Sequence, residues 1–219
     1  LGPERACAQG WISPKAMRNG IIITVLFACL IGSSLLFYAG WELIIVGLLC
    51  VLFAFLYTTG PYPLSYNGWG DILVIVFFGF VPVGGTYYVQ ALTWTTDTTI
   101  ASLICGLLID TLLVVNNYRD READARSGKR TVIVRFGEKF GSYLYLMLGM
   151  TASLLCFWFL FEGHLYAALL PLLYLIPHFL TWKRMVRIHS GKKLNSILGE
   201  TSRNMLLMGI LLSIGFFLN

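Results

Sequence analysis

The sequence predicts an all-α fold, a polytopic bundle of transmembrane helices in which residues 1–219 form one domain. Of its 219 residues, 57% are hydrophobic and only 12% are charged, against roughly 25% charged residues in a soluble globular protein. The mean hydropathy is +0.74, and apolar runs long enough to cross a bilayer recur along the chain. We expect seven spans, at residues 17–38, 41–58, 71–92, 98–115, 141–161, 165–182 and 204–218.

The distribution of basic residues supports seven spans. Four tails or connections then share one side of the membrane, at residues 1–16, 59–70, 116–140 and 183–203. All 16 Lys and Arg residues lie in these segments or at their edges, whereas the connections around Glu42, Asp97 and Glu162 contain none. By the positive-inside rule the basic side and the N-terminus are cytoplasmic. The net charge of +5 therefore reflects topology and diphosphate binding rather than nucleic-acid binding.

The most charged stretch, residues 116–137, reads NNYRDREADARSGKRTVIVRFG. Asn116, Asp120 and Asp124 recur every four residues, so a helix carries all three on one face. Oxygen ligands of this kind suit Mg²⁺, which is usually shared with substrate phosphates. The sequence therefore predicts a magnesium site at the membrane boundary.

Basic residues follow this acidic face within a few positions. Lys129, Arg130 and Arg135 are placed to bind a diphosphate, and Arg5, after a Gly-Pro pair, is a further candidate ligand. The alternative is a solvated helix end, in which neighbouring arginines balance the acidic side chains. Those arginines are Arg119, Arg121 and Arg126.

Two other places carry polar groups in apolar surroundings. The connection TGPYPLSYNGWGD, at residues 59–71, is irregular because of its prolines and glycines, and with Tyr57 before it offers tyrosines and Asp71 to a substrate. It also fits a plain connector. Asp110 lies within an apolar span, where ionisable residues are functional candidates, although a hydrogen-bonded contact between helices explains it equally well.

The DxxxD face followed by GKxTxxVRxG closely resembles the second aspartate-rich motif of the UbiA superfamily of intramembrane aromatic prenyltransferases. Within that superfamily the stretch is most similar to the 1,4-dihydroxy-2-naphthoate polyprenyltransferases of menaquinone synthesis. YTTGPYPLSYNGWGD and GPERACAQGWISPKAM resemble other signatures of that subgroup. The three motifs extend from Gly2 to Gly137, and the later spans match in hydropathy only.

The resemblance implies nine helices around a central cavity, with two aspartate-rich motifs facing each other across it. The first motif, NxxxDxxxD, and the first two helices have no counterpart here, and Leu1 falls just after the position of that motif. We therefore expect a chain that has lost its N-terminal part. Half of the metal site would be missing from such a fragment, and loss of activity is one expected consequence.

The resemblance also implies a mechanism. Mg²⁺ held by Asp120 and Asp124, with Asn116 or Asn117 assisting, would bind the diphosphate of a polyprenyl donor. The three basic residues Lys129, Arg130 and Arg135 would stabilise the departing diphosphate.

The resulting allylic cation would alkylate 1,4-dihydroxy-2-naphthoate, with loss of CO₂, to give demethylmenaquinone. Tyr57, Tyr62 and Asp71 are the expected contacts at the reacting centre. The expected location is the bacterial cytoplasmic (inner) membrane, with the active-site loops on the cytoplasmic side and the prenyl chain among the spans.

Three alternatives remain open. The first keeps the chemistry and changes the acceptor to 4-hydroxybenzoate, homogentisate or a haem precursor. A small transporter or channel would need ionisable residues at several depths, whereas here only Asp110 is clearly intramembrane. A non-catalytic remnant is the third.

Overall fold

The computed structural model describes residues 4–218, and within that range every regular element is a helix. The helices join into seven rods. The first three are α1 (Pro14–Ser33) with η1 (Ser34–Phe37), α2 (Glu42–Thr58), and α3 (Gly70–Val74) with η3 (Ile75–Gly84, π-helical) and α4 (Gly85–Ala91). The others are α5 (Thr96–Arg126), α6 (Val132–Leu155) with α7 (Trp158–Phe161), α8 (Leu165–Leu169) with η4 (Leu170–Tyr174) and α9 (Leu175–Ile188), and α10 (Leu194–Phe217). A short turn, η2 (Leu64–Tyr66), lies between α2 and α3.

The predicted seven-span bundle is confirmed in its architecture. Six rods are long and apolar enough to cross a membrane. The seventh, α2, has 17 residues, which at 1.5 Å per residue extends over roughly 26 Å, close to the thickness of the hydrocarbon core.

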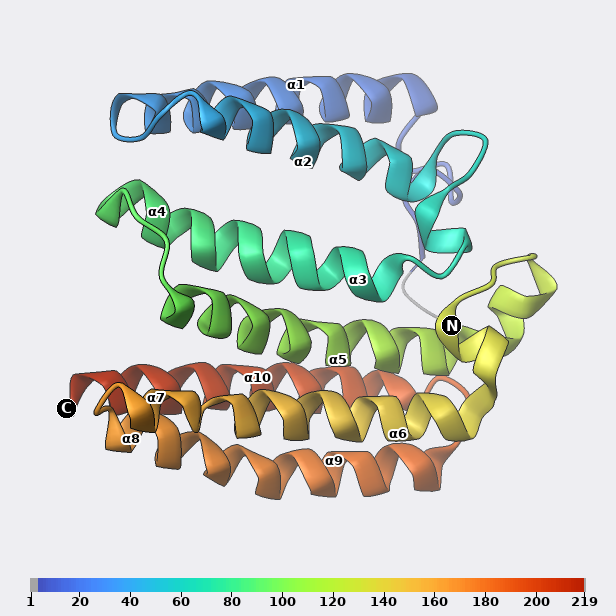
Figure 1. Cartoon of the computed structure of the whole chain (residues 1–219). Helices are drawn as coiled ribbons and strands as arrows, with labels where there is room; N and C mark the ends of the chain where they lie inside the picture. The colour runs from blue at the N-terminus through green and yellow to red at the C-terminus, as the bar shows by residue number, and fades with distance from the viewer. Residues whose placement is uncertain (1–3, 219) are drawn as a thin grey trace.

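Successive rods run in opposite directions, and their long axes lie side by side (Figure 1). The N-terminal segment and the connections 59–69, 127–131 and 189–193 therefore gather at one end of the bundle (Figure 1). This end, here called the basic end, is the one predicted from the distribution of Lys and Arg. The other end carries the connections that contain no basic residue.

The core is built around α5 and the rods that follow it. The most deeply buried apolar side chains of α5 include Val114, Val115 and Tyr118, and they pack with residues of α6, α9 and α10. By contrast, α1 and α2 bury no residue. They form a hairpin at the edge of the bundle (Figure 1), where apolar side chains suit contact with lipid.

Glycines bring η3 and α5 into backbone contact. A Cβ added to Gly79 would meet the carbonyl oxygen of Ser102 and lie 2.8 Å from Cα of Gly106. A Cβ added to Gly106 would lie 2.9 Å from Cα of Ile75. Small residues allow this close approach between membrane helices, and the contact fixes the register of the two rods.

Several predicted span boundaries were wrong. The helix predicted to begin at residue 204 begins at Leu194, and the one predicted at residue 141 begins at Val132. Polar residues near the start of α10 find partners on α9. Glu200, in the added turns, pairs with Arg184 at 2.5 Å, and the amide of Asn204, the first residue of the predicted span, donates to Thr181 Oγ1 at 2.9 Å. Hydropathy alone assigns a residue such as Glu200 to a loop, because it does not include its partner.

Candidate active site at the basic end

The end of α5 is shaped by the sequence DARSGK. Ser127 is the C-cap and Gly128 adopts φ +77°, a left-handed conformation that favours glycine. The Lys129 N–H donates to the Asp124 carbonyl at 2.9 Å, and the Gly128 N–H donates to Ala125 at 3.2 Å. These two bonds define a Schellman motif. The turn brings the Lys129 side chain back to Asp124, with Nζ 3.0 Å from Oδ1.

The acidic face lies on α5 as predicted, and Arg119 organises it. Its guanidinium donates from Nε to Asp120 Oδ1 at 2.8 Å, and Nη2 lies 2.6 Å from Oδ2. The same group donates to Asn116 Oδ1 at 2.5 Å and, on α10, to Asn195 Oδ1 at 2.8 Å. Arg119 is buried, so it holds Asp120 and Asn116 in place rather than serving as a solvated counter-ion.

The acidic face carries oxygen donors of the kind that Mg²⁺ takes in proteins. Asp120 and Asp124 offer carboxylate oxygens and Asn116 an amide oxygen on one helix face, and Mg²⁺ is commonly bound through one or two carboxylates plus phosphates. Within residues 4–218, no group of three or more His, Cys, Asp or Glu side chains is close enough together to hold a metal. Asp120 is paired with Arg119 and Asp124 with Lys129, so a metal site on this face stays a prediction from the sequence.

Two connections meet beside this helix end. The Arg130 N–H donates to the Tyr66 carbonyl at 2.7 Å, and Arg135 Nη2 donates to the Asn67 carbonyl at 2.7 Å. Thr131 caps α6, with its Oγ1 accepting from the Val134 N–H at 3.3 Å. The GKRT sequence thus ends one helix, starts the next and joins the 127–131 connection to the 59–69 connection.

A pocket of about 330 Å³ opens between α2, α3 and α5 at this end, within the size range of small-molecule sites. Tyr57 and Asp71 line it from α2 and α3, and Tyr66 lies on the connection between these helices, with Lys129 Nζ 5.2 Å from its ring centroid. Six of the predicted site residues share the lining. They are Arg5, Tyr57, Asp71, Asn116, Asn117 and Lys129.

The other predicted residues lie outside this lining. Asp120 and Asp124 continue the α5 face beyond Asn116 and are held by Arg119 and Lys129, as described above. Arg130 and Arg135 are exposed. Tyr62 is 56% exposed and does not line the pocket.

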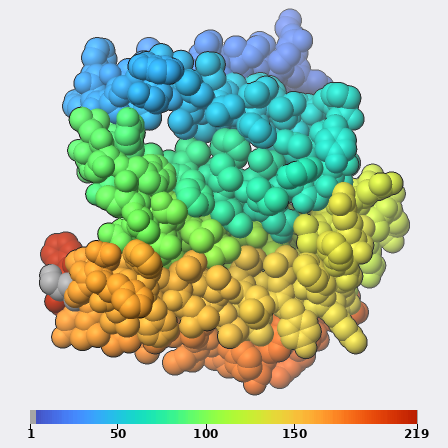
Figure 2. All heavy atoms as spheres, viewed as in Figure 1, coloured from blue at the N-terminus to red at the C-terminus, as the bar shows by residue number. Residues whose placement is uncertain are grey.

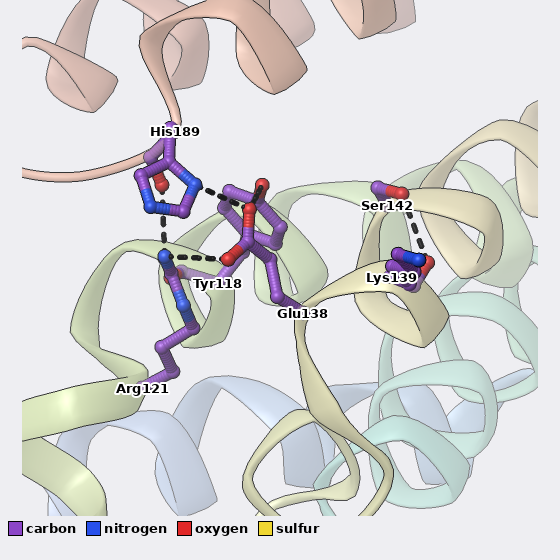
Figure 3. Close-up of polar contacts among 6 residues, drawn as sticks. All are labelled: Tyr118, Arg121, Glu138, Lys139, Ser142 and His189. Carbon is purple, nitrogen blue, oxygen red and sulfur yellow. Dashed lines mark hydrogen bonds and ion pairs between the residues drawn. The ribbon is translucent and has the colours of Figure 1, made fainter.

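A second polar cluster, missed by the sequence reasoning, ties α5 to α6 and α9 (Figure 3). The Glu138 carboxylate accepts from the Tyr118 hydroxyl at 2.7 Å and from Arg121 at 3.1 Å, and it lies 2.5 Å from His189 Nδ1. Arg121 also donates to the His189 carbonyl at 3.0 Å. Gly137, with φ +87°, kinks α6 just before Glu138. The only feature of the sequence that pointed to this cluster was Gly137 before Glu138 in a segment rich in basic residues.

Comparison with known proteins identifies the class. The profile of the UbiA prenyltransferase family matches residues 2–215. The chain belongs to the UbiA prenyltransferase family, and it is a multi-pass membrane prenyltransferase.

Individual members of the family give a more specific comparison than the family as a whole. The chain is 33% identical to the 1,4-dihydroxy-2-naphthoate octaprenyltransferase of Escherichia coli and 34% identical to that of Haemophilus influenzae. Both alignments cover 100% of this chain and 73% of the relative. It is also 29% identical to the UbiA prenyltransferase domain-containing protein 1 of Dictyostelium discoideum, over 74% of this chain and 48% of that protein. No solved structure matches the chain significantly.

Proposed function

We propose that this protein transfers a polyprenyl group from polyprenyl diphosphate to 1,4-dihydroxy-2-naphthoate in menaquinone biosynthesis, releasing diphosphate and CO₂. The observation that carries the proposal is the pocket in which Arg5, Asn116 and Lys129 meet Tyr57 and Asp71, beside the acidic face of α5. The names of the E. coli and H. influenzae relatives support this acceptor. The family match over residues 2–215 supports one prenyltransferase domain.

The donor diphosphate would bind at the junction of α5 and the 127–131 connection. Asp120, Asp124 and Asn116 would hold Mg²⁺, with Asn117 directed at the same ligand from the pocket wall. The bound ion would offset the negative charge of the diphosphate as it leaves.

Positive side chains complete this half of the site. Lys129 and Arg5 line the pocket and would bind phosphate oxygens directly. Arg130 and Arg135 lie at the outer side of the same connection and would contribute to the potential that stabilises the leaving group.

The acceptor would bind against α2 and α3. Tyr57 and Asp71 would contact the aromatic ring, since both line the pocket. Tyr62 would touch a substrate only if the 59–69 connection folded inward. The apolar surroundings of the spans would keep water from the allylic cation.

The prenyl chain would extend away from the basic end among the rods. Figure 2 shows a hollow in this face of the molecule between the α1–α2 hairpin and the α3–α4 rod. The bordering elements are apolar, because α2 has no charged residue after Glu42 and η3 has none. With the basic end cytoplasmic, the site would open to the inner face of the bacterial cytoplasmic membrane.

A reconstitution assay tests the proposal. The chain in lipid nanodiscs is incubated with a radiolabelled polyprenyl diphosphate, Mg²⁺ and either 1,4-dihydroxy-2-naphthoate or 4-hydroxybenzoate. We expect a prenylated naphthol product and labelled CO₂ from carboxyl-labelled naphthoate, both suppressed by EDTA. A product from 4-hydroxybenzoate alone would transfer the assignment to another acceptor. No product from either, together with no Mg²⁺-dependent binding of the diphosphate and no binding of the naphthoate, would refute it.

A further inference from the structure

Asp110 is an unexplained acid in the middle of the bundle. It is 1% exposed, in the membrane-spanning part of α5. Its Oδ1 is fully buried and accepts no hydrogen bond from the described part of the chain. The same holds for Oδ1 of Asp71 on α3. A buried carboxylate oxygen left without a partner is costly, so two at one level of the bundle call for a functional explanation.

Helix register places these two acids opposite each other. The α3–η3 rod and α5 are antiparallel (Figure 1), and Gly106 contacts Ile75. Toward the basic end, Asp71 lies four residues before Ile75, and Asp110 lies four residues after Gly106. Each acid is therefore about one helical turn from this contact, on the same face of its helix. The next contact in the same direction is between Gly70 and Leu113, with a Cβ added to Gly70 lying 3.2 Å from Leu113 Cδ2. The two carboxyl groups therefore lie between two fixed contacts.

The pocket reaches this level of the bundle, and Asp110 lies next to its lining rather than in it. Asp71 and Leu113 line the pocket, and Asp110 is one turn before Leu113 on the same face of α5. The Tyr57 hydroxyl is 3.5 Å from the position of a Cβ on Gly70, so a phenol lies beside the two acids. The same pocket is lined by Asn116, one turn after Leu113 on α5, and by Lys129, the groups proposed for the diphosphate.

We propose that Asp71 and Asp110 form a carboxyl pair that holds one proton, binds the hydroxyl and carboxylate groups of the aromatic acceptor, and exchanges a proton with the ring hydroxyl during transfer. This inference rests on the proposed function. Two ionised carboxylates in a medium of low dielectric constant repel each other, which is why a shared proton is the stable arrangement. An ionised and a protonated carboxyl group together match a ligand that carries both a hydroxyl donor and a carboxylate acceptor.

The proton balance closes without another reagent. As the C1–O bond of the donor breaks, its electron pair leaves with the diphosphate. The ring carbon that bears the carboxylate forms the new bond to C1, while the adjacent ring hydroxyl gives its proton to the ionised member of the pair and becomes a ketone. The intermediate is a β-keto carboxylate. When CO₂ departs, the electron pair of the broken carbon–carbon bond returns to that oxygen, which takes the proton back from the pair.

The test compares four variants of the full chain in nanodiscs. Asp110→Asn and Asp71→Asn remove one acid each, and Asp110→Glu keeps the carboxyl group. The matched control is Ser102→Ala, because Ser102 is also buried on α5, and its hydroxyl has no partner in the described residues, but it lies two turns farther from the pocket. Binding of 1,4-dihydroxy-2-naphthoate is measured by equilibrium dialysis, Mg²⁺-dependent binding of inorganic diphosphate separately, and turnover with polyprenyl diphosphate last.

We expect Asp110→Asn and Asp71→Asn to weaken naphthoate binding about 10- to 100-fold and to lower kcat by about 10²- to 10⁴-fold. Diphosphate binding should be unchanged, Asp110→Glu should recover part of the turnover, and Ser102→Ala should behave as wild type. Asp110→Asn should unfold no more easily than wild type, because it removes a buried acid.

Two results separate the possible failures. If wild type binds and prenylates the naphthoate and Asp110→Asn equals it in both assays, the acid pair is refuted and the proposed function stands. If wild type binds and prenylates no aromatic acceptor, the proposed function fails and the acid pair fails with it.

Discussion

Lys129 Nζ lies 3.0 Å from Asp124 Oδ1, so a cation proposed for phosphate binding is paired with a carboxylate proposed for metal binding. The Schellman turn makes this contact nearly obligatory, because the two residues occupy the positions that such a turn brings together. A diphosphate with Mg²⁺ offers each partner a new ligand of opposite charge. Substrate binding would therefore replace one ion pair with two interactions.

Replacing Lys129 with Met should raise the KM for polyprenyl diphosphate about 10- to 100-fold, since a charge-assisted hydrogen bond to phosphate contributes roughly 1.5–3 kcal/mol. Lys129→Arg keeps the positive charge and should raise the KM much less. Initial rates at varied donor concentration measure the effect. An unchanged KM in Lys129→Met would exclude direct contact with the diphosphate.

Removal of either carboxylate on the acidic face should abolish Mg²⁺-dependent transfer. Asp120→Ala and Asp124→Ala are each expected to lower turnover at least about 100-fold, because the ion and its charge stabilisation are lost together. The matched control, Asp97→Asn, changes an acid at the opposite end of α5 that accepts from Trp158 at 2.8 Å. Membrane insertion should be intact in all three variants, and near-normal turnover in Asp120→Ala would refute the site.

The Glu138 cluster in Figure 3 should contribute to stability. Glu138→Ala removes the acceptor shared by Tyr118, Arg121 and His189, and we expect the free energy of unfolding to fall by about 1–3 kcal/mol. Glu122→Ala, at an exposed position on α5, serves as control and should change it little. Denaturant titration in detergent measures both, and equal midpoints would show that the cluster is not stabilising.

The backbone contact between η3 and α5 should tolerate no added methyl group. In Gly106→Ala the new Cβ would meet Cα and the carbonyl oxygen of Ile75, each at 2.9 Å, and overpacking of this kind costs roughly 1–3 kcal/mol. A Cβ added to Gly209 on α10 would meet no atom within 4 Å. Gly209→Ala should therefore leave the stability of the protein unchanged or raise it slightly. Thermal unfolding compares them, and equal stability would mean that the rods separate freely.

The fold and the acidic face were predictable because both depend on local periodicity. Apolar runs gave seven rods, the basic residues marked one end, and the four-residue spacing placed Asp120 and Asp124 on one face of α5. The first aspartate-rich motif and two helices expected before Leu1 remain a prediction.

The remaining parts of the site depend on contacts between distant segments. Arg119 looked like a solvated counter-ion, yet Asn195 on α10 helps to bury it. The sequence prediction chose Tyr62 from the irregular connection, yet Tyr66 is the tyrosine of that connection that lines the pocket, with its carbonyl accepting from the Arg130 N–H. The early start of α10 likewise depends on partners, such as Arg184 for Glu200, that hydropathy does not include.

The glycine contact between η3 and α5 also determines how the two rods can move. Backbones that already touch at Gly106 cannot approach further, and Gly70 meets Leu113 on the other side of the two acids. With a contact on either side, a tilt of one rod against the other would change the separation of Asp71 and Asp110 very little. The spacing of the two acids is therefore set by how closely the rods pack, and it would be the same with and without a substrate.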